Sequence, residues 1–307
     1  MQILAVHGGL DTSRERSFMD DLEAAVRKGF QMLATGRVPA LEAVLNVLED
    51  SPRFNCGFGS VLNLDGKVEM DAAIVDGPTH RFAAVAAIRA VANPVSVARK
   101  LLEETKQVIL AGEGAVKFAR EHGFPEADCT SRQQLEAWHK AKDSLARGKT
   151  PAQNLYTGLE YHGDTVGCLV WDGQGLTAAS TTGGYSLKLP GRVGDTPSLG
   201  GGIYASRTSA TVCTGLGEAF IETLTAKYVD EQIAAGAHPQ EAVEAALRRL
   251  AGLKGAEGGI MALDARGRIG AAFNAGRFPV VVLVNGEVRK DFQPVNLRPE
   301  LATTPAR

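Results

Sequence analysis

Strands and helices do not alternate along this chain, because each kind of element comes in runs. In the second half the pattern predicts a hairpin of Thr165–Trp171 and Leu176–Thr182, joined by the turn sequence Asp172–Gly175. Two helices are expected later, at Glu218–Ala235 and Pro239–Leu250. Elements grouped in this way favour an α+β fold in which sheets pack together and are covered by helices.

The remaining expected elements follow the same periodicities. The other strands are expected at Gln2–Val6, Val68–Val75, Ala83–Ala90, Val108–Ala111, Thr208–Cys213, Ile260–Asp264, Ile269–Asn274 and Val280–Val284. The other helices are expected at Ser17–Thr35, Pro39–Leu48, Val95–Leu102 and Gly114–Glu121. From about Pro125 to Gly163 polar residues dominate, which predicts a flexible linker that holds one helix at Ser131–Ala146.

Composition restricts the partners of the chain. With 307 residues, 44% of them hydrophobic and a formal net charge of −2, it has the profile of a soluble globular protein and no field that gathers nucleic acid or anionic membrane. Its beginning lacks a signal-peptide pattern, and no apolar run approaches the roughly 20 residues that span a bilayer. The four cysteines are scattered, which favours a reducing cytoplasm: Cys56, Cys129, Cys168 and Cys213. We therefore expect a small-molecule partner or a second copy of the chain.

Two common kinds of site do not fit the sequence. The glycine-rich segments lack the spacing of a dinucleotide-binding turn or of a phosphate-binding loop. The histidines are far apart and form no zinc-binding pattern, so each is expected in a turn or at the surface: His7, His80, His122, His139, His162 and His238. No cofactor is expected for catalysis.

The segment Gly163–Gly167 is a better candidate for chemistry, because a polar linker turns there into a buried strand. Cleavage between Asp164 and Thr165 would give Thr165 a free α-amine beside its hydroxyl. Such an amine has a reference pKa of about 7.7–8.0, so a slight depression leaves much of it neutral at pH 7. It could then take the proton from its own hydroxyl, which makes one residue both nucleophile and base.

A second cluster follows in the glycine-rich run Lys188–Pro197, where Arg192 and Asp195 are three residues apart. An arginine and an aspartate in one turn can hold the α-carboxylate and the α-ammonium of an amino acid together. The sequence therefore predicts an amino-acid-like substrate next to the threonine.

These residues belong to an ordered set of motifs by which the chain resembles the plant-type (type III) L-asparaginases, or isoaspartyl aminopeptidases, of the N-terminal-nucleophile hydrolases. The resemblance covers nearly the whole length. Its motifs are His7–Gly9, Phe54–Gly59, Met70–Ala72, Gly112–Ala115, Gly163–Gly167, Thr181–Gly184, Gly191–Pro197 and Thr214–Glu218.

The resemblance implies a role for each matching residue. Thr165 is expected to cleave the chain after Asp164 and to act as the catalytic nucleophile, with Thr182 hydrogen-bonded to its surroundings. Arg192 is expected to bind the substrate α-carboxylate and Asp195 its α-ammonium.

Four further roles come from the same resemblance. Thr214 and Gly215 are expected to form the oxyanion hole, Gly217 to contact the substrate through its backbone, and Asn55 to lie near the nucleophile and bind substrate. Backbone carbonyls of one loop are expected to bind a structural sodium ion, and its ligands would be Leu48, Glu49, Ser51, Phe54, Cys56 and Phe58.

The family fold implied is a four-layer αββα sandwich, formed by residues 1–307 as a single domain that is cleaved into 1–164 and 165–307, with a linker at about 125–163. The expected assembly is a dimer of cleaved heterodimers. The expected substrates are L-asparagine, β-aspartyl dipeptides, or both.

Two alternatives remain open from the sequence. One is a glycosylasparaginase, although those enzymes tend to have isoleucine in place of Val166 and asparagine in place of Gly183. The other is a homologue that binds an amino acid but does not cleave itself. A denaturing gel separates the second alternative from the enzymes, because only the enzymes give two fragments.

Overall fold

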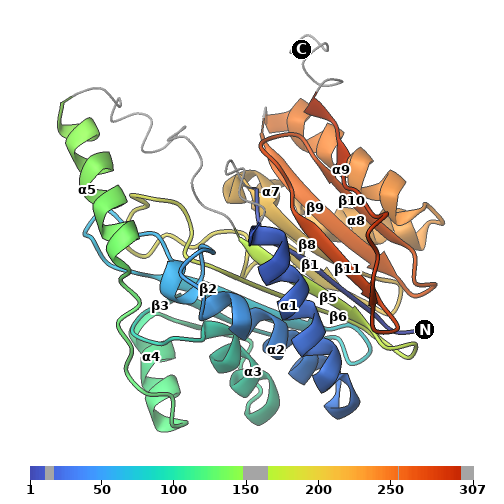
Figure 1. Cartoon of the computed structure of the whole chain (residues 1–307), viewed down its shortest axis with the longest axis horizontal. Coiled ribbons are helices and arrows are strands. Elements are labelled where there is room, and N and C mark those ends of the chain that lie inside the picture. Colours follow the sequence, from blue (N-terminus) through green and yellow to red (C-terminus); the bar gives the residue numbers. More distant parts are fainter. Residues whose placement is uncertain (11–16, 148–164, 255, 299–307) are drawn as a thin grey trace.

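A computed structural model of the chain describes residues 1–10, 17–147, 165–254 and 256–298, which form two β-sheets (Figure 1). The larger sheet has eight strands in the spatial order β12 (Glu287–Val288), β11 (Val280–Val284), β1 (Ile3–His7), β5 (Val166–Trp171), β6 (Leu176–Thr182), β2 (Met70–Asp76), β3 (Arg81–Ile88) and β4 (Ile109–Ala111). The smaller sheet has five strands in the order β13 (Val295–Asn296), β10 (Ile269–Phe273), β9 (Gly258–Asp264), β8 (Ser209–Gly215) and β7 (Ile203–Ala205).

Strands β5 and β6 form the predicted hairpin at the centre of the larger sheet. Their register pairs Val166 with Thr181 at one end and Trp171 with Leu176 at the other. The Asp172 carboxylate closes the turn by accepting the N–H groups of the residues that follow it, Gln174 and Gly175, at 2.8 and 2.9 Å. Because β1 and β2 flank this hairpin, the start of β5 lies deep in the molecule.

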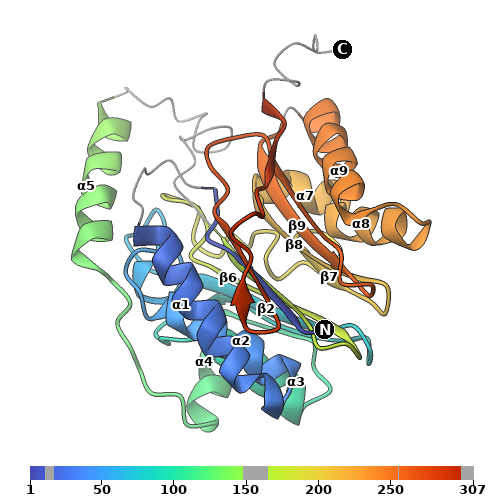
Figure 2. The ribbon, with the colours of Figure 1, turned by 45° about the vertical axis from the view of Figure 1, so that its right-hand side comes forward.

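Helices pack on both sheets (Figures 1 and 2). The larger sheet is contacted by α1 (Ser17–Met32), α2 (Arg37–Glu49), α3 (Pro94–Glu104) and α4 (Gly112–Glu121). The smaller sheet is contacted by α8 (Thr225–Ala234) and α9 (Pro239–Lys254), and α7 (Gly217–Thr223) packs on those two helices. Two short 3-10 helices, η1 and η2, lie at Leu33–Thr35 and Gly57–Gly59.

Side chains of the central strands are buried on both faces. In β1, Leu4 and Val6 join the apolar cluster beneath helices α1 to α4, whereas Ile3 and Ala5 join a second cluster shared by the two sheets. This alternation follows the two-residue period of a strand. Among the described residues, no helix is both long and apolar enough to cross a membrane.

Helix α5 (Arg132–Ala146) confirms the helix that the sequence predicts within the polar linker. The Ser131 hydroxyl caps it by accepting the N–H of Gln134. None of its residues is buried, and it projects from the body of the molecule (Figure 1). Trp138 attaches it to the loop before β2 by donating to the carbonyl of Asn63 at 2.8 Å. The rest of the predicted linker, 148–163, lies outside the described residues.

One predicted helix is wrong, because Glu218–Ala235 is interrupted at Leu224, whose φ of 48° is left-handed. The interruption turns the first N–H groups of α8 towards a glycine loop. Ala226 and Lys227 donate there to the carbonyls of Gly201 and Gly200, at 3.0 and 2.9 Å. Those bonds satisfy donors that a helix start otherwise leaves unpaired. The short strands β7, β12 and β13 were not predicted either.

Candidate active site

Thr165 immediately precedes β5 and is 6% exposed. Continuing the β5–β6 register by one residue places it opposite Thr182. Successive side chains of a strand point to opposite faces, so Thr165 points the same way as Leu169, four residues later, which belongs to the cluster shared by the two sheets. Thr165 therefore faces the space between the sheets. Asp164, the other half of the predicted cleavage site, lies outside the described residues.

A small pocket opens beside Thr165 and brings together five residues for which the sequence predicts a role. They come from separate parts of the second half of the chain: Thr165, Thr182, Arg192, Asp195 and Gly215. Gly184, Tyr185 and Gly194 complete the lining. This convergence makes the pocket the candidate active site.

The guanidinium of Arg192 is held in one plane. Its Nε and Nη2 each donate to the carboxylate of Glu218 at 2.9 Å, and it stacks 4.3 Å above the ring of Tyr185. A guanidinium has five N–H donors, so this pairing leaves others for a ligand. Arg192 thus offers a fixed, charged edge suited to a carboxylate.

Asp195 supplies the opposite charge. It is 4% exposed, and its Oδ2 has no hydrogen-bond partner among the described residues. Burial raises the pKa of Asp195 to about 7, although the charge of Arg192 acts to lower it. A buried carboxylate oxygen without a partner is costly, and an ammonium group of a ligand would relieve that cost.

Gly217 keeps the space between these two charges open. A Cβ on Gly217 would lie 2.8 Å from Asp195 Oδ1 and 2.9 Å from Arg192 Nη2. A Cβ on Gly202 would lie 2.4 Å from Asp195 Oδ2. Side chains at either position would therefore collide with Asp195 or Arg192. Gly217 itself does not line the pocket, and its backbone contact to the substrate stays a prediction.

Thr214 and Gly215 end strand β8, and the side chain of Thr214 faces the larger sheet. Two residues before Thr214, Val212 belongs to the cluster shared by the sheets, so Thr214 points the same way. Thr214 is fully buried and its Oγ1 has no partner within the described structure. Gly215 has a φ of 136°, and a Cβ there would lie 2.5 Å from the carbonyl of Glu257. The strand end thus provides an unused hydroxyl donor next to a position that only glycine fits.

Thr182 and Asn55 shape the turn after β6. The Thr182 hydroxyl accepts the N–H of Gly184 at 3.0 Å. Asn55 donates to the Gly184 carbonyl at 2.5 Å and accepts the N–H of Val61 at 2.9 Å, while its own carbonyl accepts the N–H of Gly183 at 2.8 Å. Asn55 therefore does not line the pocket. Its side-chain amide bonds backbone groups behind the pocket and positions the turn after β6.

The loop predicted to bind sodium gathers backbone oxygens. The Glu49 carbonyl comes so close that a Cβ on Gly57 would lie 2.1 Å from it, and the Phe54 carbonyl would lie 1.8 Å from a Cβ on Gly59. Three of the predicted ligand carbonyls, those of Leu48, Phe54 and Cys56, also accept backbone N–H groups. Each carbonyl has a second lone pair, so this oxygen-rich loop fits a hard cation.

Sequence reasoning missed some residues of the site. Tyr185 and Glu218, which hold Arg192, were not assigned a role, although Glu218 ends one of the motifs.

The prediction that His7 lies in a turn or at the surface is wrong, because His7 is fully buried in β1. Its pairing with Gly167 explains the burial, since a Cβ on Gly167 would lie 2.5 Å from its Nε2. Burial also lowers the pKa of His7 to about 3, so the ring is neutral.

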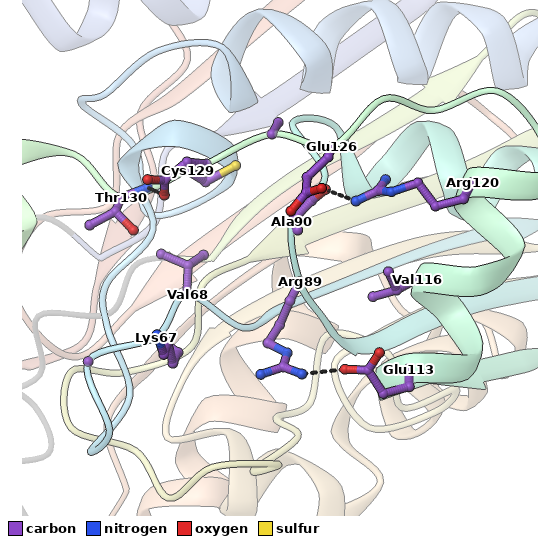
Figure 3. Close-up of a pocket in the computed structure, with 13 residues that line it drawn as sticks. Lys67, Val68, Arg89, Ala90, Glu113, Val116, Arg120, Glu126, Cys129 and Thr130 are labelled. Atoms are coloured by element: carbon purple, nitrogen blue, oxygen red, sulfur yellow. Dashed lines mark hydrogen bonds and ion pairs between the residues drawn. The ribbon is translucent and has the colours of Figure 1, made fainter.

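A larger cavity, of about 650 Å³, lies between the loop before β2, the end of β3 and helix α4 (Figure 3). Both of its arginines are engaged, since Arg89 pairs with Glu113 and Arg120 donates to the carbonyl of Ala90. Burial, followed by nearby carboxylates, raises the pKa of the Cys129 thiol to about 11, so it is no thiolate. None of the residues with a predicted catalytic role lines this cavity.

Known proteins are similar to the chain over almost all of its length. A family model described as asparaginase matches residues 1–290. The plant-type L-asparaginase of Pyrococcus abyssi is 42% identical over 285 residues, which are 89% of this chain and 93% of that protein. That of Thermococcus kodakarensis is 41% identical over 93% of this chain and 97% of its own length. The isoaspartyl peptidase/L-asparaginase of the mouse is 34% identical over 94% of this chain and 89% of its own length. The chain belongs to the asparaginase family.

Proposed function

We propose that this chain cleaves itself before Thr165 and then hydrolyses the side-chain amide of L-asparagine and the isopeptide bond of β-aspartyl dipeptides. The observation that carries the proposal is the pocket in which Thr165 lies with Arg192 and Asp195. The hydroxyl nucleophile of Thr165 thus shares one pocket with the positive charge of Arg192 and the negative charge of Asp195. The relatives named above, an L-asparaginase and an isoaspartyl peptidase/L-asparaginase, support this substrate class.

Arg192 and Asp195 are suited to the α-carbon end of the substrate, which L-asparagine and β-aspartyl dipeptides have in common. L-Asparagine and a β-aspartyl dipeptide each carry an α-carboxylate and an α-ammonium on the carbon next to the reacting side chain. Arg192 would bind the first group and Asp195 the second. The two substrates differ only in the leaving group, which is ammonia in one case and the α-amine of an amino acid in the other.

The reaction is an acyl transfer in two steps. The Thr165 hydroxyl attacks the side-chain carbonyl and gives its proton to the free α-amine of Thr165. The negative charge on the carbonyl oxygen is stabilised by the Thr214 hydroxyl and the Gly215 N–H. The C–N bond then breaks, the amine leaves with the proton, and water hydrolyses the ester to release aspartate and restore Thr165.

The two fragments would remain one domain after cleavage. In the larger sheet β1 of the first fragment lies between β11 and β5 of the second, and β6 of the second lies beside β2 of the first. Separation would break backbone ladders on several strands. We also assign this chain the four-layer αββα arrangement, because apolar clusters lie beneath the helices on each sheet and between the sheets.

A structural sodium ion is proposed for the loop after α2. Its ligands would be backbone carbonyls of Leu48, Glu49, Ser51, Phe54, Cys56 and Phe58. The close approach of the Glu49 carbonyl to Gly57 and of the Phe54 carbonyl to Gly59, within one loop, supports this assignment. A bound ion would fix the loop that leads to Asn55.

A substrate panel tests the function. Purified, processed protein is incubated with L-asparagine, L-glutamine, β-Asp-Leu and α-Asp-Leu, and released ammonia or leucine is measured. We expect turnover of L-asparagine and β-Asp-Leu. L-Glutamine should be inert because its reacting carbonyl lies one methylene farther from the α-charges, and α-Asp-Leu because its aspartyl α-carboxyl forms the peptide bond and is no free carboxylate. Equal turnover of α- and β-Asp-Leu would contradict recognition through Arg192 and Asp195.

A further inference from the structure

Two carboxylates beneath the pocket hold the backbone on either side of Arg192. Glu69, just before β2, accepts the N–H of Gly191 through Oε2 at 2.8 Å. Asp71, in β2, accepts the N–H of Gly194 through Oδ2 at 3.2 Å. Both side chains are buried, with Asp71 fully so. The segment that carries Arg192 and Asp195 is therefore attached to the larger sheet at two points.

The second oxygen of Asp71 anchors it to the next strand. Oδ1 accepts the N–H of Ala87 at 2.8 Å. Ala87 has a φ of 46°, a conformation that residues other than glycine rarely adopt, and it lies where the β2–β3 register shifts between Met70 and Ala72. Asp71 thus connects an irregularity in β3 to the active-site loop, and both its oxygens are occupied.

Lys188 completes this cluster with a buried positive charge. It is fully buried, and its Nζ donates to the backbone carbonyl of Glu69 at 2.7 Å. Burial lowers the pKa of Lys188, while the charges of Asp71 and Glu69 oppose that shift. A Cβ on Gly184 would lie 2.8 Å from Nζ, so Lys188 also packs beneath the turn that lines the pocket.

None of these three side chains lines the pocket, but Asp71 bonds Gly194 and Lys188 packs against Gly184, and both of these glycines line it. Glu69 bonds Gly191, which precedes Arg192. We propose that Asp71, assisted by Glu69, is a positioning residue that sets the distance between Arg192 and Asp195, so that one substrate can reach both. The proposal rests on the proposed function, in which these two side chains bind the α-charges. Hydrogen bonds to a buried carboxylate are strong enough for this task, because they are charge-assisted.

The test variant is Asp71→Asn, which keeps the size of the side chain and turns one acceptor into a donor that cannot accept an N–H. In processed enzyme the KM for L-asparagine is expected to rise about ten- to a hundredfold, as for loss of a charged hydrogen bond, with kcat within about threefold. The matched control is Asp76→Asn on the same strand, because Asp76 bonds Arg37, Thr79 and Thr177 instead. The control should match the wild type.

Coupling to Arg192 separates positioning from a general loss of packing. In an Arg192→Ala background, Asp71→Asn should change the KM less than about twofold, because no pair of charges remains whose spacing Asp71 sets. Equal effects of Asp71→Asn with and without Arg192 would overturn the proposal. If Asp71→Asn does not fold, Glu69→Gln is the test variant instead. Its KM for L-asparagine should rise by a smaller factor, and an unchanged KM would count against the proposal.

Hydrogen exchange distinguishes failure of this inference from failure of the proposed function. The amides of Gly191–Asp195 should exchange at least about tenfold faster in Asp71→Asn than in Asp76→Asn, whatever the enzyme hydrolyses. Faster exchange in Asp71→Asn, together with a wild type that does not hydrolyse L-asparagine, would support the positioning role and reject the proposed function. Unchanged exchange would overturn the positioning even if the wild type is an active asparaginase.

Discussion

Arg192 and Glu218 are 26 positions apart and are joined by two hydrogen bonds of 2.9 Å, from Nε to Oε1 and from Nη2 to Oε2. The side chain of Arg192 is 13% exposed and that of Glu218 46% exposed, so the pair lies at the border of the pocket with solvent. Glu218 also belongs to the first turn of α7. The pairing fixes the direction of the guanidinium before any substrate arrives.

Replacing Glu218 tests this preorganisation. Glu218→Gln keeps one acceptor but loses the charge, so Arg192 should sample more orientations and the KM for L-asparagine should rise about three- to tenfold. Glu222→Gln is the matched control, since Glu222 lies in the same helix and pairs with Lys254 away from the pocket. Steady-state kinetics that show the same KM for both variants would remove the role assigned to Glu218.

Arg192→Ala should have a larger effect than Glu218→Gln. Loss of a charged hydrogen bond in a partly dry site costs about 1.5–3 kcal/mol, so kcat/KM for L-asparagine should fall roughly ten- to a hundredfold or more. Arg249→Ala is a suitable control, because Arg249 also stacks on a tyrosine, Tyr228, and bonds a backbone carbonyl. Unchanged kinetics in Arg192→Ala would show that the α-carboxylate is bound elsewhere.

The pKa of Asp195 predicts how substrate binding depends on pH. Burial, partly offset by Arg192 and reinforced by Glu218 and Asp71, raises this pKa to about 7, so the carboxyl of the free enzyme is protonated at pH 5 and ionised at pH 8. Only the ionised form attracts an ammonium group. Calorimetry should therefore show that the affinity for L-aspartate increases between pH 5 and 8, whereas that for succinate, which lacks the ammonium, does not.

The same pKa has a consequence for stability. Because the pKa is raised on folding, the native state binds more protons than the unfolded state between about pH 4 and 7, and the free energy of unfolding decreases as pH rises through that window. Asp195→Asn lacks this dependence. The free energies of unfolding of Thr165→Ala and of Thr165→Ala with Asp195→Asn, both uncleaved, are compared by denaturant unfolding. The variant with Asp195→Asn should gain stability relative to the protein with Asp195 from pH 4 to 7. A constant difference would mean that the pKa is not raised.

Self-cleavage is tested at Thr165. In the proposed mechanism its hydroxyl attacks the preceding carbonyl, and water then hydrolyses the ester to give fragments 1–164 and 165–307. Mass spectrometry of Thr165→Ala should find one intact chain, while Thr165→Ser, which keeps a hydroxyl, should still cleave. Cleavage of the alanine variant at the same bond would require another nucleophile.

Much of the site could be predicted because its residues are close in sequence or lie in recognisable motifs. Arg192 and Asp195 are three residues apart in one turn, and Thr165 is marked by the change from polar linker to buried strand. The strand–turn–strand pattern around Asp172 is local in the same way. Such features depend on neighbouring residues, which a sequence displays directly.

Features that depend on distant pairing could not be predicted. Asp71 meets Gly194 across 123 positions and Ala87 at a β-bulge, and neither contact has a local pattern. The break at Leu224 has no glycine or proline to announce it, since bonds to the loop at Gly200 and Gly201 outweigh the helical preference of the segment. His7 was misplaced for a related reason, because its burial follows from pairing with Gly167.

The hydroxyl of Thr214 is buried without a partner at the end of β8, and Gly215 beside it lines the pocket. A buried, unpaired donor calls for an explanation, and beside a pocket a ligand or transition state can supply one. A capping role is excluded, since Leu216 holds the N-cap position of α7 and no side chain caps that helix. The structure thus favours an oxyanion donor over a helix cap.

Thr214→Val removes this donor while keeping the shape of the side chain. If the hydroxyl stabilises the developing oxyanion, its loss should cost about 2.7–4 kcal/mol of transition-state stabilisation, a roughly hundred- to thousandfold decrease in kcat, with the melting temperature nearly unchanged. Thr211→Val is the matched control, because Thr211 lies on the same strand, is equally buried and also has an unpartnered hydroxyl, but an odd separation of three residues puts it on the opposite face. Both variants are assayed after complete cleavage. A kcat for Thr214→Val equal to that of Thr211→Val would leave the oxyanion hole without its side-chain donor.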